Sequence, residues 1–329
     1  MASSQRVVMS SEIIKLEDYK ERREALLADL RNVREYALFE YETLSIKDKE
    51  LNLVKEELIY FFDAIPRLFG DQESVYNKLD LSILFAKILH EGQERKFEKT
   101  DNNENKPYLA HLLRVARYVA DKLFVLCDNG ANCDNELKLD ILRAALFHDS
   151  VEDRFLQLYP TEEELSYKEA RVHALDEIER KFGERVRHYV HVLSKPAWED
   201  KSLESYHEWL DHIWQDGDEI STILKFADLR DNFAGLLELY GFVQWANFEG
   251  EYDAVFKYEQ LFKKYIVSVL NLRAFLSEEN ITGKVLRGKI MEDLDKLIEH
   301  ANDIVFGPRE NKDFKNMSID DILNSDIIS

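Results

Sequence analysis

Residues 144–153 read AALFHDSVED, and the prediction of the fold starts from this stretch. Four apolar residues lead into an adjacent histidine and aspartate, and two more carboxylates follow. Adjacent positions on a helix are separated by about 100° around the axis, so His148 and Asp149 reach one ion from neighbouring faces. Glu152 and Asp153 lie one turn further on, above the first pair. We expect a single buried helix, a costly place for these charges unless a cation or a base offsets them.

Two other segments supply further candidate ligands. Upstream, residues 107–111 read PYLAH and begin a predicted helix with a proline near its start. Downstream, residues 225–228 read KFAD. Imidazole nitrogen with carboxylate oxygen suits a divalent ion such as Mn, Fe or Zn with open positions for water and substrate, and cysteine contributes nothing. The candidate ligands are His111, His148, Asp149 and Asp228.

Each of these pieces alone has a simpler interpretation. A lone His-Asp dipeptide in a charged chain is common, and His111 alone is more often a satisfied interfacial histidine. The run from Asp228 to Asn232 alone is more often a solvated helix end. The ordered combination on helices is what favours a metal site.

The composition excludes several classes of protein. The 329 residues include 44 Lys and Arg against 65 Asp and Glu, a net charge of −21, which argues against binding duplex nucleic acid through phosphate attraction. The 45% hydrophobic content is enough for a packed core. No apolar run approaches the roughly 20 residues of a membrane span, and Met1 to Ile14 lack a signal-peptide pattern. The thiols Cys127 and Cys133 are expected to be unpaired, which indicates a reducing, cytoplasmic setting.

Helical periodicity dominates the chain, which predicts an all-α protein. Stretches from Leu16 to Leu44 and from Lys47 to Phe69 are expected to form a helical hairpin that packs or binds a partner, a protein or a second copy of the chain. Polar loops, one of them from Glu98 to Lys106, interrupt the helices that follow. Two further helices are expected at Glu249–Phe275 and Lys284–Ala301. The tail beyond residue 307 is expected to be mobile, with isoleucines that could dock: Ile319, Ile322 and Ile327.

The order of these motifs resembles that of the HD-domain metal phosphohydrolases. Within them it is most similar to the hydrolase domain of the RelA/SpoT family, which degrades the alarmone ppGpp. The family's opening signature is similar to HEGQERK at residues 90–96, which is followed by the proline of residues 107–111. FGERV at residues 182–186 and LSK at residues 193–195 resemble a later helix and its turn. The likeness covers roughly residues 76–240.

The resemblance implies a role for each matching residue. The four candidate ligands would hold one Mn²⁺, or another divalent ion, per chain. Glu152 and Asp153 would position or activate the attacking water and manage protons at the leaving group. Arg95 and Lys96 would face the nucleotide, and Asn232 would contact its sugar or neighbouring groups.

Departures from the family pattern leave the substrate open. The loop Phe97–Lys106 is longer than usual and lies beside the implied nucleotide pocket. Leu112 follows the first histidine where proline is common, and Arg230 is displaced by one position. None of these removes a ligand, but loops and neighbouring residues set specificity.

The sequence therefore predicts an all-α protein with an HD hydrolase core at residues 73–245. An N-terminal helical arm precedes it (1–72) and a C-terminal helical extension with an acidic tail follows it (246–329). The expected activity is metal-dependent removal of the 3′-pyrophosphate from ppGpp-like guanosine nucleotides. One alternative is hydrolysis of another nucleotide phosphate, a cyclic nucleotide or a dinucleotide. A further alternative is a degenerate core that serves as a sensor or scaffold.

Overall fold

The computed structural model describes residues 16–39, 44–99, 104–154, 167–195, 202–216, 218–240, 252–277, 284–307 and 313–325. Helices make up nearly all of these ranges, so the all-α class is confirmed. Three predictions fall outside the described residues. They concern the N-terminal segment Met1–Ile14, the side chain of Lys96 and the docking of Ile327.

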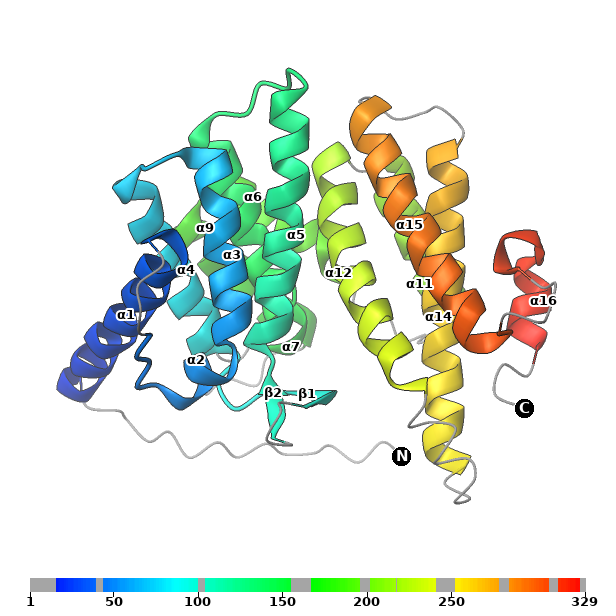
Figure 1. The fold of residues 1–329 in the computed structure, drawn as a ribbon, viewed down its shortest axis with the longest axis horizontal. Helices are drawn as coiled ribbons and strands as arrows, with labels where there is room; N and C mark the ends of the chain where they lie inside the picture. Colours follow the sequence, from blue (N-terminus) through cyan, green and yellow to red (C-terminus); the bar gives the residue numbers. More distant parts are fainter. Residues whose placement is uncertain are drawn as a thin grey trace.

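The first half of the chain is a bundle of helices around α5 (Figure 1). Helix α3 packs along α5, α1 packs on α3 and α4, and α6 packs on the other side of α5. The predicted N-terminal hairpin therefore shares one continuous apolar core with the helices that follow it. The elements are α1 (Leu16–Phe39), α2 (Lys49–Leu53), α3 (Lys55–Phe69), α4 (Glu73–Leu89), β1 (Glu94–Lys99), β2 (Asn105–Pro107), α5 (Leu109–Asp128), α6 (Asn135–Phe147) and α7 (Ser150–Asp153).

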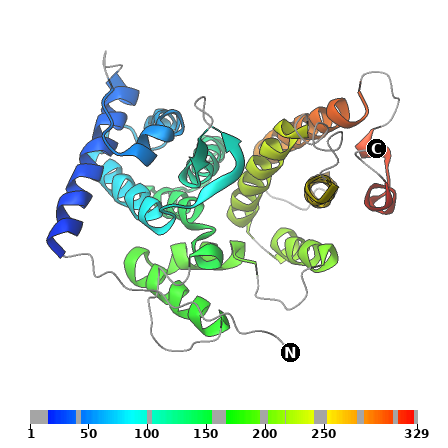
Figure 2. The same cartoon turned by 90° about the horizontal axis from the view of Figure 1, so that it is seen from below.

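Helix α12 joins this bundle to the second half of the chain. It contacts α5 on one side and α14 and α15 on the other, and α11 packs beside it (Figure 1). The view from below looks nearly along α5 and α14, with α12 between them (Figure 2). The remaining elements are α9 (Tyr167–Phe182), α10 (Glu184–Leu193), α11 (Leu203–Asp216), α12 (Glu219–Glu238), α14 (Tyr252–Ser277), α15 (Lys284–Val305), the 3-10 helix η1 (Phe314–Asn316) and α16 (Ile319–Asn324).

The helix predicted over residues 144–153 is interrupted, and the prediction of one continuous helix was wrong. Helix α6 ends at Phe147, His148 and Asp149 form a turn, and α7 follows. The reason lies in the imidazole of His148, whose Nδ1 is 2.8 Å from the carbonyl oxygen of Ala145. In an unbroken helix that carbonyl accepts the N–H four residues on, so the side chain competes with the backbone. Both turn residues keep right-handed helical dihedrals.

The described parts of the segment predicted as a polar loop belong largely to two paired strands, β1 and β2. Strands β1 and β2 pair antiparallel, with Glu94 opposite Pro107 and Lys99 opposite Asn105. A side chain fastens the hairpin to α3: Lys106, in β2, donates to Glu57 across 2.7 Å. The hairpin lies beside the start of α5, which carries His111 (Figure 1).

The described part of the tail is helical. Phe314 and Ile322 are fully buried, whereas Ile319 is exposed. The expectation of a mobile tail is thus replaced by a docked segment at residues 313–325, where α16 packs on α14. Among the described helices, none combines the length and apolarity that crossing a bilayer would require.

Candidate metal centre

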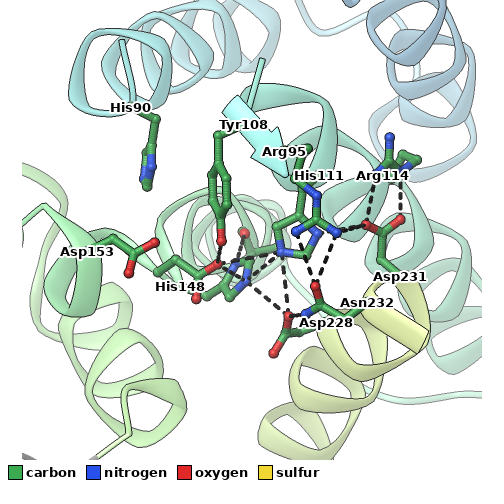
Figure 3. A network of polar contacts seen from close by, with 12 residues as sticks. His90, Arg95, Tyr108, His111, Arg114, His148, Asp153, Asp228, Asp231 and Asn232 are labelled. Carbon is green, nitrogen blue, oxygen red and sulfur yellow. Dashed lines mark hydrogen bonds and ion pairs between the residues drawn. The ribbon is translucent and has the colours of Figure 1, made fainter. Parts of the chain in front are cut away.

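The four candidate ligands converge from three places in the fold, and Figure 3 labels three of them, His111, His148 and Asp228. His111 lies in the first turn of α5, His148 and Asp149 form the turn between α6 and α7, and Asp228 lies in the middle of α12. Their nearest ligand atoms all lie within 4.8 Å of one another. The Nε2 atom of His111 is 3.3 Å from Nε2 of His148 and 3.5 Å from an oxygen of each carboxylate. Nε2 of His148 is 3.0 Å from Asp149 Oδ2 and 3.5 Å from Asp228 Oδ1.

These spacings fit one shared ion. Two atoms bonded to a metal at about 2.1 Å lie roughly 3.0 Å apart at a right angle and roughly 3.4 Å apart in a tetrahedron. The five contacts that involve a ligand nitrogen run from 3.0 to 3.5 Å. Two imidazole nitrogens that face each other can form a hydrogen bond only if one of them is protonated. A cation bound to both nitrogens would remove the need for that proton. The four residues could therefore hold a divalent metal ion.

The ring of His111 is oriented by a charged pair that the sequence analysis did not assign. Its Nδ1 lies 2.7 Å from Oδ2 of Asp231, which fixes the ring so that Nε2 faces the cluster. Asp231 in turn accepts hydrogen bonds from Arg114 at 2.6 and 3.0 Å. A carboxylate behind a ligating histidine sets its tautomer and raises its basicity. The spacing carried a signal, because Asp231 lies three residues after Asp228 and Arg114 three residues after His111, one helical turn in each case.

The other ligands are oriented in the same manner. The backbone carbonyl bonded to Nδ1 of His148 leaves its Nε2 pointing into the cluster. The hydroxyl of Tyr108 donates to Asp149 at 2.5 Å. Asp228 accepts from Lys225 at 2.7 Å on one oxygen and from Asn232 at 2.5 Å on the other. Tyr108 and Lys225 were also unassigned, although both lie within the quoted motifs.

Burial and charge act against each other at this site. Burial alone would lower the pKa of His111, but hydrogen bonds to Asp149, Asp228 and Asp231 raise it to about 9. The pKa of His148 is raised well above its usual range by the two neighbouring carboxylates, against the effect of burial. Burial would raise the pKa of Asp149, but the two histidines hold it well below its usual range. Protons on the imidazoles thus balance the carboxylates while no metal does so.

We predict that metal binding releases protons and strengthens with pH. The ion needs neutral imidazoles, whereas His111 with a pKa of about 9 is protonated at neutral pH in the metal-free protein. For each proton displaced, the dissociation constant for Mn²⁺ should fall about tenfold per pH unit below that pKa. Calorimetric titrations at pH 6.5, 7.5 and 8.5 (roughly the useful range for stable Mn²⁺) measure this slope. An affinity that stays constant over this interval contradicts the arrangement.

Replacing Asp231 with asparagine should weaken the site without emptying it. The variant keeps an acceptor near Nδ1 of His111 but loses the negative charge that supports the imidazole. We expect the affinity for Mn²⁺ to fall about 10- to 100-fold, with the helical fold retained. Glu238→Gln is the matched control, because Glu238 is exposed at the end of the same helix. Equal affinities in the two variants would argue against this role of Asp231.

A cavity of about 380 Å³ opens beside the cluster. It brings together three of the residues predicted to act on a substrate: Arg95 from β1, Asp153 from α7 and Asn232 from α12. The guanidinium of Arg95 donates to Oδ1 of Asn232 at 3.1 and 3.2 Å and to Glu98 at 2.7 Å. The volume of the cavity is in the range of small-molecule sites. Tyr108 and Tyr265 supply aromatic wall.

The two predicted catalytic carboxylates have different surroundings. Asp153 accepts a hydrogen bond from the amide of Gln93 at 2.9 Å and faces the cavity. Glu152 is not among the residues that line the cavity and accepts the backbone N–H of Lys195. Burial, together with the charge of Asp149, raises the pKa of Glu152 to about 7. Glu152 is therefore poised to exchange a proton near neutral pH.

The chain was compared with known proteins. No family model matches it, and no curated protein matches it. The function is therefore inferred from the residues and from the geometry of the site.

Proposed function

We propose that this protein is a metal-dependent phosphohydrolase that removes the 3′-pyrophosphate from ppGpp-like guanosine nucleotides. The observation that carries the proposal is a four-residue ligand set that is bonded to the wall of a cavity. Tyr108 and Asn232 line this cavity and donate hydrogen bonds to two of the ligands, Asp149 and Asp228. Mn²⁺ is the proposed ion, since imidazole and carboxylate ligands suit it. A divalent ion held there would polarise a phosphoryl oxygen and lower the pKa of water.

The residues of the chain divide the remaining work. Arg95 would neutralise phosphate charge, and exchanging its bond to Asn232 for a phosphate would free Asn232 to contact the sugar. Glu152, with a pKa near neutrality, would accept a proton from the attacking water. Asp153, held by Gln93 at the wall of the cavity, would orient the water or return a proton to the leaving group.

The intact site supports an enzyme over a scaffold. Every ligand has a second hydrogen-bond partner that orients it, and such networks are costly to leave half complete. A degenerate core has no physical need for this arrangement. Hydrolysis of another nucleotide phosphate, a cyclic nucleotide or a dinucleotide remains the alternative, because the same ligand set serves each of them.

The proposal is tested with purified full-length protein, Mn²⁺ and a panel of nucleotides separated by chromatography. The panel holds ppGpp, GTP, GDP, cyclic mononucleotides and cyclic dinucleotides. We expect ppGpp to yield GDP and pyrophosphate, and a chelator to abolish the reaction. A preparation of Asp149→Ala, purified in parallel, reveals any contaminating phosphatase. Hydrolysis of other members of the panel without hydrolysis of ppGpp would support the alternative, a hydrolase of another nucleotide phosphate, a cyclic nucleotide or a dinucleotide.

A further inference from the structure

Cationic side chains gather around Tyr206 on the side of α11 that faces α14. The ammonium of Lys264, in α14, lies 3.8 Å from the centroid of the Tyr206 ring, and that of Lys195 lies 5.4 Å from the same centroid. Lys225, in α12, lies 4.5 Å from the ring centroid of Trp209, one turn further along α11. In a chain with a net charge of −21, three ammonium groups from three elements are thus held near one buried aromatic pair.

Lys264 has no polar partner among the described residues. Its ammonium makes no hydrogen bond or ion pair there and lies over two aromatic rings, those of Tyr206 and, at 5.3 Å, Tyr265. Burial and the charges of Lys225 and Lys195 lower the pKa of Lys264 to about 8. The charges of Asp228 and Glu152 oppose this shift, but neither carboxylate bonds to the ammonium. A half-buried ammonium beside two other lysines is unfavourable without a direct anionic partner. The arrangement therefore indicates a place for an anion.

The position of the lysines relative to the metal centre follows from α12. Lys225 lies one turn before Asp228 and bonds to its Oδ2, whereas Asn232 lies one turn after and bonds to its Oδ1. Lys225 and the Arg95–Asn232 pair thus flank Asp228 along the helix. Seven residues of helix separate Lys225 from Asn232, a rise of about 10 Å. Tyr265, the neighbour of Lys264, lines the cavity and connects the two sides.

We propose that Lys264 and Lys195 form a second phosphate-binding subsite, to which the C-terminal helical extension contributes through α14. Lysine binds phosphate as a point charge, and Lys225 adds to the field while it holds Asp228. The subsite gives the extension a direct part in substrate binding. It also narrows the substrate class to nucleotides with phosphate groups at both ends of the ribose. The inference about the substrate class rests on the proposed function. The inference that Lys264 and Lys195 bind phosphate oxygen does not.

Binding of inorganic pyrophosphate to the full-length chain tests the subsite directly. The titration is done by calorimetry without added metal, because free Mn²⁺ would sequester the probe. Lys264→Met should weaken binding at least about tenfold, since it removes a charge-assisted contact. Lys264→Arg keeps the charge and should stay within about threefold of the parent. Lys257→Met is the matched control, because Lys257 is exposed on the same helix.

A structural role of Lys264 gives a different result. If the ammonium only packs on the two tyrosines, Lys264→Met changes the melting temperature and leaves the pyrophosphate affinity as in the control, which overturns the proposal. Lys195→Met repeats the test from another element in case Lys264→Met does not fold, and unchanged binding there also overturns it. If Lys264→Met weakens pyrophosphate binding but the parent does not hydrolyse ppGpp, the subsite is supported and only the proposed substrate is refuted. With ppGpp as substrate, Lys264→Met should raise KM about tenfold and leave Mn²⁺ affinity unchanged.

Discussion

Asp149→Ala is expected to bind Mn²⁺ at least about 100-fold more weakly than the parent and to lose at least about 1000-fold in turnover. The carboxylate lies within 3.5 Å of both ligand nitrogens, so its removal takes one of four ligands and half of the negative charge that attracts the ion. The fold should survive. Asp149 precedes α7 without a capping hydrogen bond from its side chain, and its partners are site residues.

Calorimetry with Mn²⁺, the nucleotide assay and far-UV circular dichroism together measure this prediction. Asp303→Ala is the matched control, because Asp303 is exposed on α15, away from the site. The control should retain metal, activity and helix content. Stoichiometric Mn²⁺ and parental turnover in Asp149→Ala would show that the ligand set is assigned wrongly.

Much of the fold followed from hydrophobic periodicity. In their described parts, the predicted stretches from Leu16, Lys47 and Glu249 match helices of the structure, because amphipathic spacing over many residues is a strong local signal. The break after Phe147 was missed because it depends on one side chain that competes for one carbonyl. The hairpin was missed because its strands are short and polar, without the alternation that identifies a half-buried strand.

The site divides in a similar way. The four ligands were predicted from residue types and their order, and the structure brings their atoms together. The residues that orient these ligands were not predicted. Asp231 and Arg114 are separated by 117 residues and meet only when α5 packs on α12. Charged residues at helical spacing occur in any acidic helical protein, so the spacing alone does not distinguish an orienting pair from a solvated face.

The lysine cluster shows a further limit of local reasoning. Lys195 follows α10, whereas Lys225 lies in α12 and Lys264 in α14. Lys195 and Lys225 fall within quoted motifs, but nothing in the sequence indicates that the three lysines meet. Their meeting depends on α11 placing Tyr206 between α12 and α14. The position of α14 thus changes the interpretation of the C-terminal extension from a packing element to a part of the proposed binding site.

Glu152→Gln is expected to lower kcat about 100-fold or more while Mn²⁺ affinity stays within about threefold of the parent. The substitution preserves shape, and the amide oxygen of glutamine still accepts the N–H of Lys195. It removes the group whose pKa, raised by burial and by Asp149 to about 7, suits proton exchange near neutrality. Because Glu152 lies outside the ligand set, loss of its charge should act on turnover rather than on metal binding.

The pH profile separates a proton-transfer role from a structural one. A base must be deprotonated to act, so the parent should gain activity as pH rises through the pKa of Glu152, and the glutamine variant should lack that ascending limb. Glu299→Gln, exposed on α15, should behave as the parent in rate and profile. If Glu152→Gln turns over ppGpp at the parental rate with the limb intact, Glu152 only anchors the turn at Lys195. The proton acceptor would then have to be sought at Asp153, the carboxylate that faces the cavity.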